Sequence, residues 1–329
     1  MVGLDGLRAA AAGMIVLHHA GPLVFGSDIA GGLDVGVMLF FALSGYVLYR
    51  SFGPRDVAVA PYLLRRVARI WPAYLVAAFG VAVFLQPSYL SAPLGLLTMG
   101  NSPLEVIWTL RLELGFYCLL PLIARFLRSQ SFRRRLIVLG WLACISLAFG
   151  SLVPMGSAIP VGLAVWAFVP GMIVADVSLT RPDLLRRTGA IAAAGIALIG
   201  LSVIANAPYP DFAGGIGAAL LLPWFAAWQP ARLTPFVAAA GGISYSVYLW
   251  HLPLIHVFGL WAIPLTVAIS AVAFTLIERP CMAGARYLIR MWSEPRSSMS
   301  LRWPRVDVAA GPPLPIPVSL AGPIGGSTG

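Results

Sequence analysis

The sequence predicts an all-α protein, a polytopic transmembrane bundle of about ten helices with both termini in the cytoplasm. Apolar residues make up 59% of its 329 residues and charged residues only 10%, whereas a soluble domain carries about a quarter of charged residues. The chain also divides into apolar stretches that are long enough to cross a bilayer, which requires ~20 residues per helix. The apolar surface is therefore too large for a soluble core, and lipid must cover it.

Polar, Gly/Pro-rich and Arg-rich breaks separate the apolar stretches. Each stretch is predicted to be one membrane-spanning helix. They lie near residues 4–25, 33–52, 71–88, 104–127, 134–155, 157–178, 188–206, 213–230, 235–257 and 261–282.

The breaks alternate in charge along the chain. Arginines gather at residues 50–69, 125–135, 181–187 and 232, whereas the breaks between them carry only acids, such as Asp28, Asp34, Glu105 and Asp211. Positively charged loops stay in the cytoplasm, so both termini are expected there, in the cell (inner) membrane. The net charge of +10 thus reflects topology, with membrane lipids as partners and no nucleic acid.

Two segments differ from the membrane spans. In residues 62–71, apolar and basic side chains fall on opposite sides of a helix, which predicts a helix on the cytoplasmic surface before Pro72 turns the chain into the third span. Residues 284–329 are basic and then rich in Pro, Gly and Ser, which predicts a disordered cytoplasmic tail after a membrane domain at 1–283.

The first span carries two ionisable residues, Arg8 and His19. Ionisable groups inside a membrane are costly and therefore candidates for function. The spacing of 11 residues puts both within about 20° of one helix face but roughly 16 Å apart along the axis. Arg8 is expected near the cytoplasmic mouth and His19 beyond the middle of the membrane. The alternative is an Arg that snorkels and a His that bonds a nearby carbonyl.

Two further spans carry polar groups. Arg111, Glu113 and Tyr117 lie in the fourth span, with Glu113 and Tyr117 four residues apart on one face. Ser244, Tyr248 and His251 follow a spacing of four and three residues, which makes one polar stripe on the ninth span. The alternative for Ser244 and Tyr248 is hydrogen bonding between helices.

Counting residues from the middle of each span places His19, Glu113 and His251 at similar depth, roughly 3–6 Å to the outer side of the midplane. A carboxylate beside a His orients the ring and stabilises the imidazolium, which makes a general base. We therefore expect His19 and Glu113 to form a catalytic pair, with His251, Ser244, Tyr248 and Tyr117 lining the acceptor site.

Six motifs resemble the membrane-bound acyltransferase family 3, in order along nearly the whole chain. They are LDGLR followed by His19, FFALSGY at 40–46, YLLRRVARIWPAY at 62–74, WTLRLELGFYCLLP at 108–121, ISYSVYLWHLPL at 243–254 and IERP at 277–280. The family's fourth-span motif carries a second acid where this chain has Leu114 and a Ser where it has Arg111, and Met38 replaces a polar residue of the second span.

The resemblance implies an O-acyltransferase domain at 1–283 that uses acyl-CoA, in particular acetyl-CoA, as co-substrate and has no bound cofactor. His19 would be catalytic, and Arg8, Arg66 and Arg69 would bind the anionic donor, as guanidinium groups suit phosphates. The acceptor would be a hydroxyl of a carbohydrate, a lipid-linked sugar or a glycosylated small molecule. Anionic lipid is the alternative ligand of these arginines.

Two other classes of protein could use the same polar residues. A transporter builds proton relays from intramembrane Arg, Glu and His, but often shows repeated halves, and this sequence has no such repeat. A metal enzyme could use His18, His19, His251 and Glu113, but adjacent histidines diverge by about 100° on a helix. Cys118, Cys144 and Cys281 lack metal-site spacing, so no metal is expected.

Overall fold

The computed structural model describes residues 1–26, 28–52, 57–91, 102, 104–152, 165–205 and 212–293. Within these ranges the regular secondary structure is helical, and none of them contains a strand. Residues Met1–Ile289 form one compact unit; of the second unit, Arg290–Gly329, only the four residues that end the last helix are described. The all-α prediction is confirmed.

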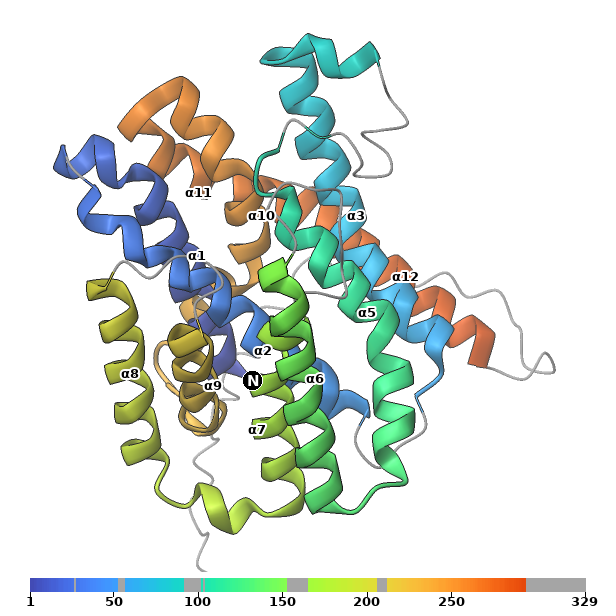
Figure 1. Cartoon of the computed structure of the whole chain (residues 1–329). Helices are drawn as coiled ribbons and strands as arrows, with labels where there is room; N and C mark the ends of the chain where they lie inside the picture. The colour runs from blue at the N-terminus through green and yellow to red at the C-terminus, as the bar shows by residue number, and fades with distance from the viewer. Residues whose placement is uncertain are drawn as a thin grey trace, which may run out of the picture. The chain divides into compact units, whose positions relative to one another are not determined.

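The helices follow one another along the chain with short connections, and their labels are those of Figure 1. They are α1 (Val2–Phe25), α2 (Gly36–Phe52), α3 (Val59–Phe84), α5 (Ile107–Arg128), α6 (Phe132–Leu152), α7 (Val169–Thr180), α8 (Thr188–Ile204), α9 (Phe212–Ala227), α10 (Thr234–Phe258), α11 (Ala262–Ala273) and α12 (Arg279–Ser293). A π-helical turn, Phe274–Glu278, joins α11 to α12.

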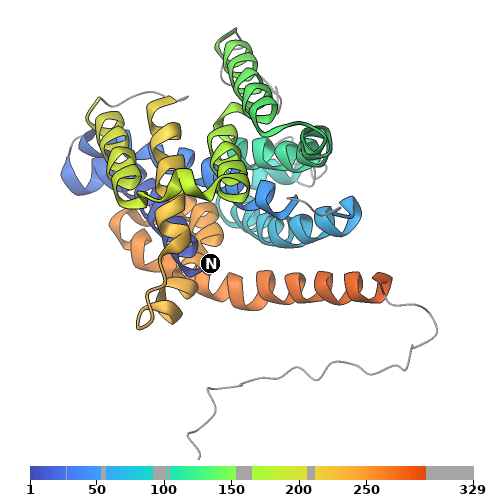
Figure 2. The same ribbon diagram turned by 90° about the horizontal axis from the view of Figure 1, so that it is seen from below.

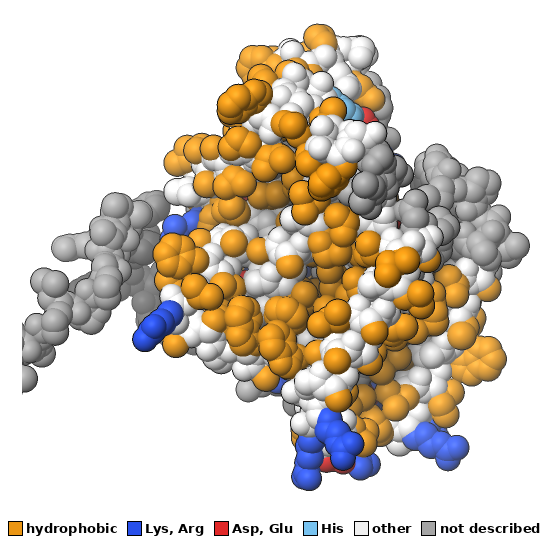
Figure 3. Space-filling model, turned by 90° about the vertical axis from the view of Figure 1, so that its left-hand side faces the viewer, with side chains coloured by type: hydrophobic (Ala, Val, Ile, Leu, Met, Phe, Trp, Pro, Cys, Tyr) orange, Lys and Arg blue, Asp and Glu red, His pale blue; other side chains and the backbone are white. Residues whose placement is uncertain are grey.

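The protein is a multi-pass membrane protein. Five segments are long and apolar enough to cross a membrane, Val2–Phe25, Gly31–Phe52, Val59–Phe84, Ile107–Arg128 and Thr234–Ser293, and α7, α8 and α9 are shorter apolar helices. Figure 3 shows a broad apolar surface with Arg side chains gathered near one end. Each of the ten predicted stretches overlaps a helix, while the number of spans and their orientation stay predictions.

Helix α2 is the centre of the bundle. It contacts α1, α5, α7 and α9, and 72% of the most apolar part of its segment is buried, against 22–44% in the other four candidate spans. Small residues permit this packing, as is usual between membrane helices. A Cβ on Gly45 would lie 2.1 Å from the Phe168 carbonyl oxygen at the start of α7. Helices α8 and α9 lie side by side in both Figure 1 and Figure 2.

The structure corrects the prediction of a separate surface helix at residues 62–71. These residues belong to α3, which continues as one helix from Val59 to Phe84 with Pro72 inside it. A proline removes one backbone hydrogen bond and kinks or breaks many helices, but membrane helices tolerate it where their neighbours supply packing. The basic residues of this segment therefore lie on a transmembrane helix.

The structure also corrects the start of the tail. Residues 284–293, predicted to be disordered, form the second half of α12. Arg279, Arg286 and Arg290 fall on one side of this helix and Leu288 and Trp292 on the other, a pattern that the tail's composition had hidden. Residues 294–329, and the loop residues Arg55 and Asp211, lie outside the described residues.

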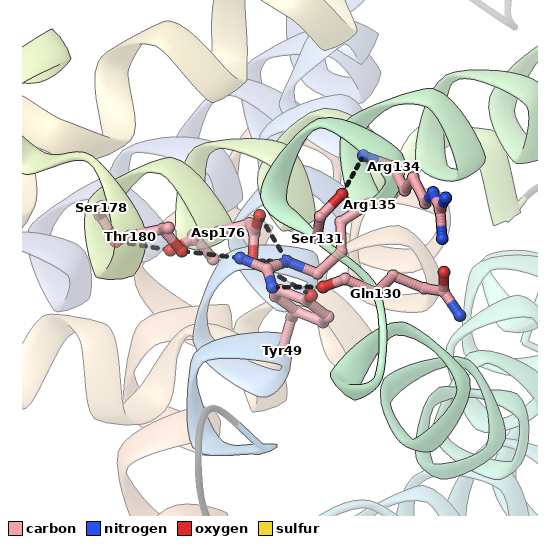
Figure 4. A network of polar contacts seen from close by, with 9 residues as sticks. Tyr49, Gln130, Ser131, Arg134, Arg135, Asp176, Ser178 and Thr180 are labelled. Carbon is pink, nitrogen blue, oxygen red and sulfur yellow. Dashed lines mark hydrogen bonds and ion pairs between the residues drawn. The ribbon is translucent and has the colours of Figure 1, made fainter.

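A polar network joins α2, α6 and α7 (Figure 4). The Arg135 Nε lies 2.9 Å from the Asp176 carboxylate, and another nitrogen of this guanidinium donates to the Thr180 hydroxyl at 2.9 Å. Tyr49 donates to Asp176 at 3.4 Å. Only 4% of Asp176 is exposed, so its charge is stabilised by these donors instead of water.

Replacing Asp176 by Ala should therefore destabilise the fold, because it leaves the Arg135 guanidinium half-buried without its counter-ion. We expect a loss of about 3–5 kcal/mol, measured as a lower midpoint of thermal unfolding of the purified protein. Asp183→Asn is the matched control, because the Arg181–Asp183 pair is exposed and such pairs contribute little. Equal midpoints for the two variants would contradict a stabilising role for the buried network.

Candidate active site

Seven of the residues selected from the sequence line one pocket. Their side chains come from four helices and share polar or charged groups that face the same space. They are Arg8 of α1, Arg66 and Arg69 of α3, Glu113 and Tyr117 of α5, and Ser244 and Tyr248 of α10. The cavity volume is about 80 Å³, which holds several water molecules and is narrower than most ligand pockets.

The pocket is cationic. Among its described lining residues, three arginines face one carboxylate, that of Glu113. Arg8 is paired at 2.7 Å with Asp5, one helical turn before it. The buried Nε of Arg66 has no hydrogen-bond partner, although its guanidinium lies 6.0 Å from the centre of the Tyr62 ring. A buried donor without an acceptor is costly, so this pocket is suited to an anion that would accept from Arg66.

Glu113 is held by hydroxyl groups. Ser44 of α2 donates to Glu113 Oε1 at 3.0 Å, and Tyr117 donates to the same oxygen. Because Gly45 packs directly against α7, the preceding residue, Ser44, is fixed on the side of α2 that faces the pocket. The carboxylate is therefore oriented by groups from two helices.

The two histidines form a separate pair between α1 and α10. His251 Nε2 lies 3.3 Å from His19 Nδ1, and the ring centres are 5.0 Å apart. His251 is fully buried, whereas His19 is partly exposed. The sequence had placed both at one depth, and the structure brings them into contact.

The hydrogen bonds assign the tautomers of both rings. His19 Nδ1 lies 2.9 Å from the Ile15 carbonyl oxygen, and His251 Nδ1 lies 2.7 Å from that of Tyr248. A carbonyl can only accept, so in each neutral ring Nδ1 carries the proton. His251 Nε2 then accepts from His19 Nδ1, and His19 Nε2 keeps a free lone pair for base chemistry.

The expected pairing of His19 with Glu113 differs from what the structure describes. Glu113 binds Ser44 and Tyr117, and His19 binds Ile15 and His251. Equal depth fixes the level of a residue along the membrane normal but not the direction of its side chain, and α5 directs Glu113 toward α2. The carboxylate whose charge reaches His19 is that of Glu105.

Tyr248 connects the pocket with the histidine pair. Its side chain lines the pocket, and its hydroxyl lies 2.7 Å from the Thr109 hydroxyl. Its backbone carbonyl accepts from His251, and the two rings are 5.8 Å apart. The cationic pocket and the candidate base are therefore neighbours along α10.

Close packing of α1 against α10 brings these parts together. A Cβ on Gly241 would lie 2.5 Å from both the Cβ and the carbonyl oxygen of Asp5. Only a glycine permits this approach. Asp5 then pairs with Arg8 beside Ser244, and His19 meets His251 about three turns further along α1.

Sequence reasoning missed several residues of the site. Asp5 was detectable, because it lies three residues before Arg8, the spacing of helix neighbours. Ser44 lies in the FFALSGY motif, but nothing in the sequence says which face of α2 meets Glu113. Tyr245, which lines the pocket and donates to the Ile70 carbonyl at 2.9 Å, was hidden beside the stripe of Ser244 and Tyr248.

No group of three or more His, Cys, Asp or Glu side chains placed to hold a metal ion occurs within the described ranges. His18 and His19 contact each other edge to face, with ring centres 4.7 Å apart.

Comparison with known proteins was carried out for the whole chain. A family model described as an acyltransferase domain matches residues 1–277. The putative membrane-bound transacylase BcsY of Komagataeibacter xylinus is 27% identical over 330 residues, which cover 84% of this chain and 81% of that protein. Protein 2 in the picA locus of Rhizobium radiobacter is 42% identical over 78 residues, 22% of this chain and 40% of that protein. No solved structure matches.

Replacing Gly241 by Ala should separate α1 from α10 and destabilise the protein by roughly 1–3 kcal/mol, because the new methyl group meets the backbone of Asp5. Gly13→Ala, on α1, is the control, since nothing lies within 4 Å of that position and Ala stabilises a helix by about 0.5–1 kcal/mol relative to Gly. The midpoints of thermal unfolding should move in opposite directions. A shift of the same sign and size in both would contradict the close approach.

Proposed function

Because the chain belongs to the acyltransferase 3 family of membrane-bound acyltransferases, we propose that it transfers an acyl group, in particular acetyl, from cytoplasmic acyl-CoA to a hydroxyl. The acceptor is a glycan, a lipid-linked sugar or a glycosylated small molecule, and the reaction takes place in the cell (inner) membrane. The observation that carries this proposal is a cationic pocket directly beside a base whose free nitrogen the hydrogen bonds define.

The arginines support an anionic donor. Arg8 already has Asp5 as its counter-ion, whereas the buried Nε of Arg66 lacks an acceptor. The phosphates of CoA supply such acceptors, and guanidinium groups bind phosphate with paired hydrogen bonds. With its phosphates near Arg66 and Arg69, the donor extends its pantetheine arm past Tyr248 toward His19.

The histidine pair supports general-base chemistry. His19 Nε2 takes the proton of the acceptor hydroxyl as its oxygen attacks the thioester carbonyl; the C–S bond then breaks, and the CoA thiolate takes up the proton. His251 accepts from His19 Nδ1 and stabilises the imidazolium that forms, the role that a carboxylate has in other catalytic pairs. The electron pair of the broken bond leaves with sulfur, so the step requires no oxidant and no metal.

Glu113 has a positioning role in this proposal. Its carboxylate offsets part of the positive charge of the pocket and accepts from Ser44 and Tyr117, so that the arginines do not repel one another when the donor is absent. Ser244, Tyr248 and Tyr117 line the path of the acyl arm.

The base is tested by His19→Ala in the purified protein with radiolabelled acetyl-CoA. Loss of the base should reduce the rate of transfer by about 10²–10⁴-fold, measured as acetylated lipid or glycoside. His18→Ala is the matched control and should stay within a few-fold of the wild type, because the tautomer argument concerns only the next ring. Comparable losses in both variants would contradict the assignment.

The donor pocket is tested by Arg66→Gln, with Arg65→Gln as the control on the same helix. Charge-assisted hydrogen bonds contribute about 1.5–3 kcal/mol, so the KM for acetyl-CoA should rise by roughly 10–150-fold in Arg66→Gln. Arg65 is not among the lining residues, and its variant should keep the wild-type KM. An unchanged KM in Arg66→Gln would place the donor elsewhere.

A covalent route, in which His19 itself takes the acyl group before the acceptor does, is separated from direct transfer by one experiment. The protein is incubated with labelled acetyl-CoA alone, quenched and digested, and the α1 peptide is analysed by mass spectrometry. Acetyl on His19 favours the covalent route, and its absence in a protein that turns over favours direct transfer.

A further inference from the structure

A second groove lies beyond the histidine pair, at the other end of α10 from the cationic pocket. It is lined by the end of α3, by Glu105 just before α5, and by the last turns of α10. Its polar groups are Gln86, Glu105 and His256. Its cavity volume is about 220 Å³, larger than that of the cationic pocket.

The groove adjoins the candidate base. Its wall includes Leu252 and Pro253, which directly follow His251 in α10. Glu105 and His256 are both close enough for their charges to act on His19. A ligand in this groove would therefore approach the histidine pair from the side opposite the arginines.

The polar groups of the groove differ in kind from those of the cationic pocket. Glu105 Oε1 and His256 Nδ1 are 3.8 Å apart, and both side chains are more than half exposed, so they are available to a ligand. A carboxylate accepts two hydroxyl groups, while an amide and an imidazole both donate and accept. None of the described lining residues is Arg or Lys. This set favours a neutral compound with several hydroxyl groups and disfavours an anion.

The remaining walls are apolar, with Val81, Leu85 and Val257 among them. The groove has room for about one sugar ring, since ligand pockets for larger molecules run to several hundred Å³. The apolar walls suit the alkyl or lipid part of an amphipathic glycoside. Charge, size and polarity therefore agree.

We propose that this groove, which we call the Glu105 groove, binds the acceptor as a single neutral sugar ring and rejects anionic sugars. The inference rests on the proposed function and extends it, because it names the acceptor class and the residues that select it. The donor and the acceptor then reach His19 from opposite ends of the bundle.

Binding is tested first, without turnover. In a full-length protein with Cys118, Cys144 and Cys281 replaced by Ser, Val257→Cys places a thiol in the groove wall. The rate of its reaction with a membrane-impermeant maleimide is measured in a detergent without sugar, alone and with hexyl glucoside or hexyl glucuronide. Glucoside should slow the reaction at least about 5-fold more than glucuronide, whose carboxylate meets that of Glu105.

Selectivity is tested next, by competition of the two glycosides for acetyl from acetyl-CoA. The wild type should prefer glucoside, and Glu105→Gln should reduce that preference by about 5–20-fold, because it removes the repulsion of the anion. Asp183→Asn, which neutralises an exposed acid far along the chain, should leave the preference unchanged. A variant that merely unfolds loses both reactions equally and does not change their ratio.

The outcomes separate the two proposals. Selective protection by glucoside without any acetyl-CoA turnover supports the groove and refutes the acyltransferase reaction. Turnover with equal protection by both glycosides, or an unchanged preference in Glu105→Gln, refutes the groove and leaves the reaction intact.

Discussion

The approach of α1 to α10 at Gly241 is the contact on which the rest of the site depends. Without a side chain there, the backbone of Asp5 lies against α10, and two consequences follow from one helix pair. Asp5 neutralises Arg8 beside the cationic pocket, and His251 meets His19 further along the same two helices. Neither helix alone holds a functional unit, because the pocket and the base each take residues from both.

Helix α10 divides the molecule by charge. On one side of His251 its residues line a pocket with three arginines, and on the other side they line a groove with Glu105. A base between a cationic and an anionic compartment can accept two substrates of opposite character without either competing for the other's place. This arrangement suits a transfer between an anionic nucleotide thioester and a neutral alcohol.

Much of this could be predicted from the sequence, for identifiable reasons. Hydropathy and arginine breaks located the helices, because lipid forces backbone groups to pair within each segment. The spacing of Ser244 and Tyr248 placed them on one face, and both line the pocket. The partner of His19 was not predictable, since depth says nothing of direction, and Glu105 looked like an ordinary loop acid. The α3 segment and α12 were also misjudged, because charge was read as surface or disorder.

Tyr248 has one further consequence. Its ring belongs to the cavity and its carbonyl holds the proton of His251, so a rigid turn of helix joins the occupancy of one compartment to the alignment of the base in the next. A thioester that enters without its full nucleotide leaves that turn undisturbed. The same few atoms that guide the acyl arm thereby guard it against wasteful hydrolysis by stray water.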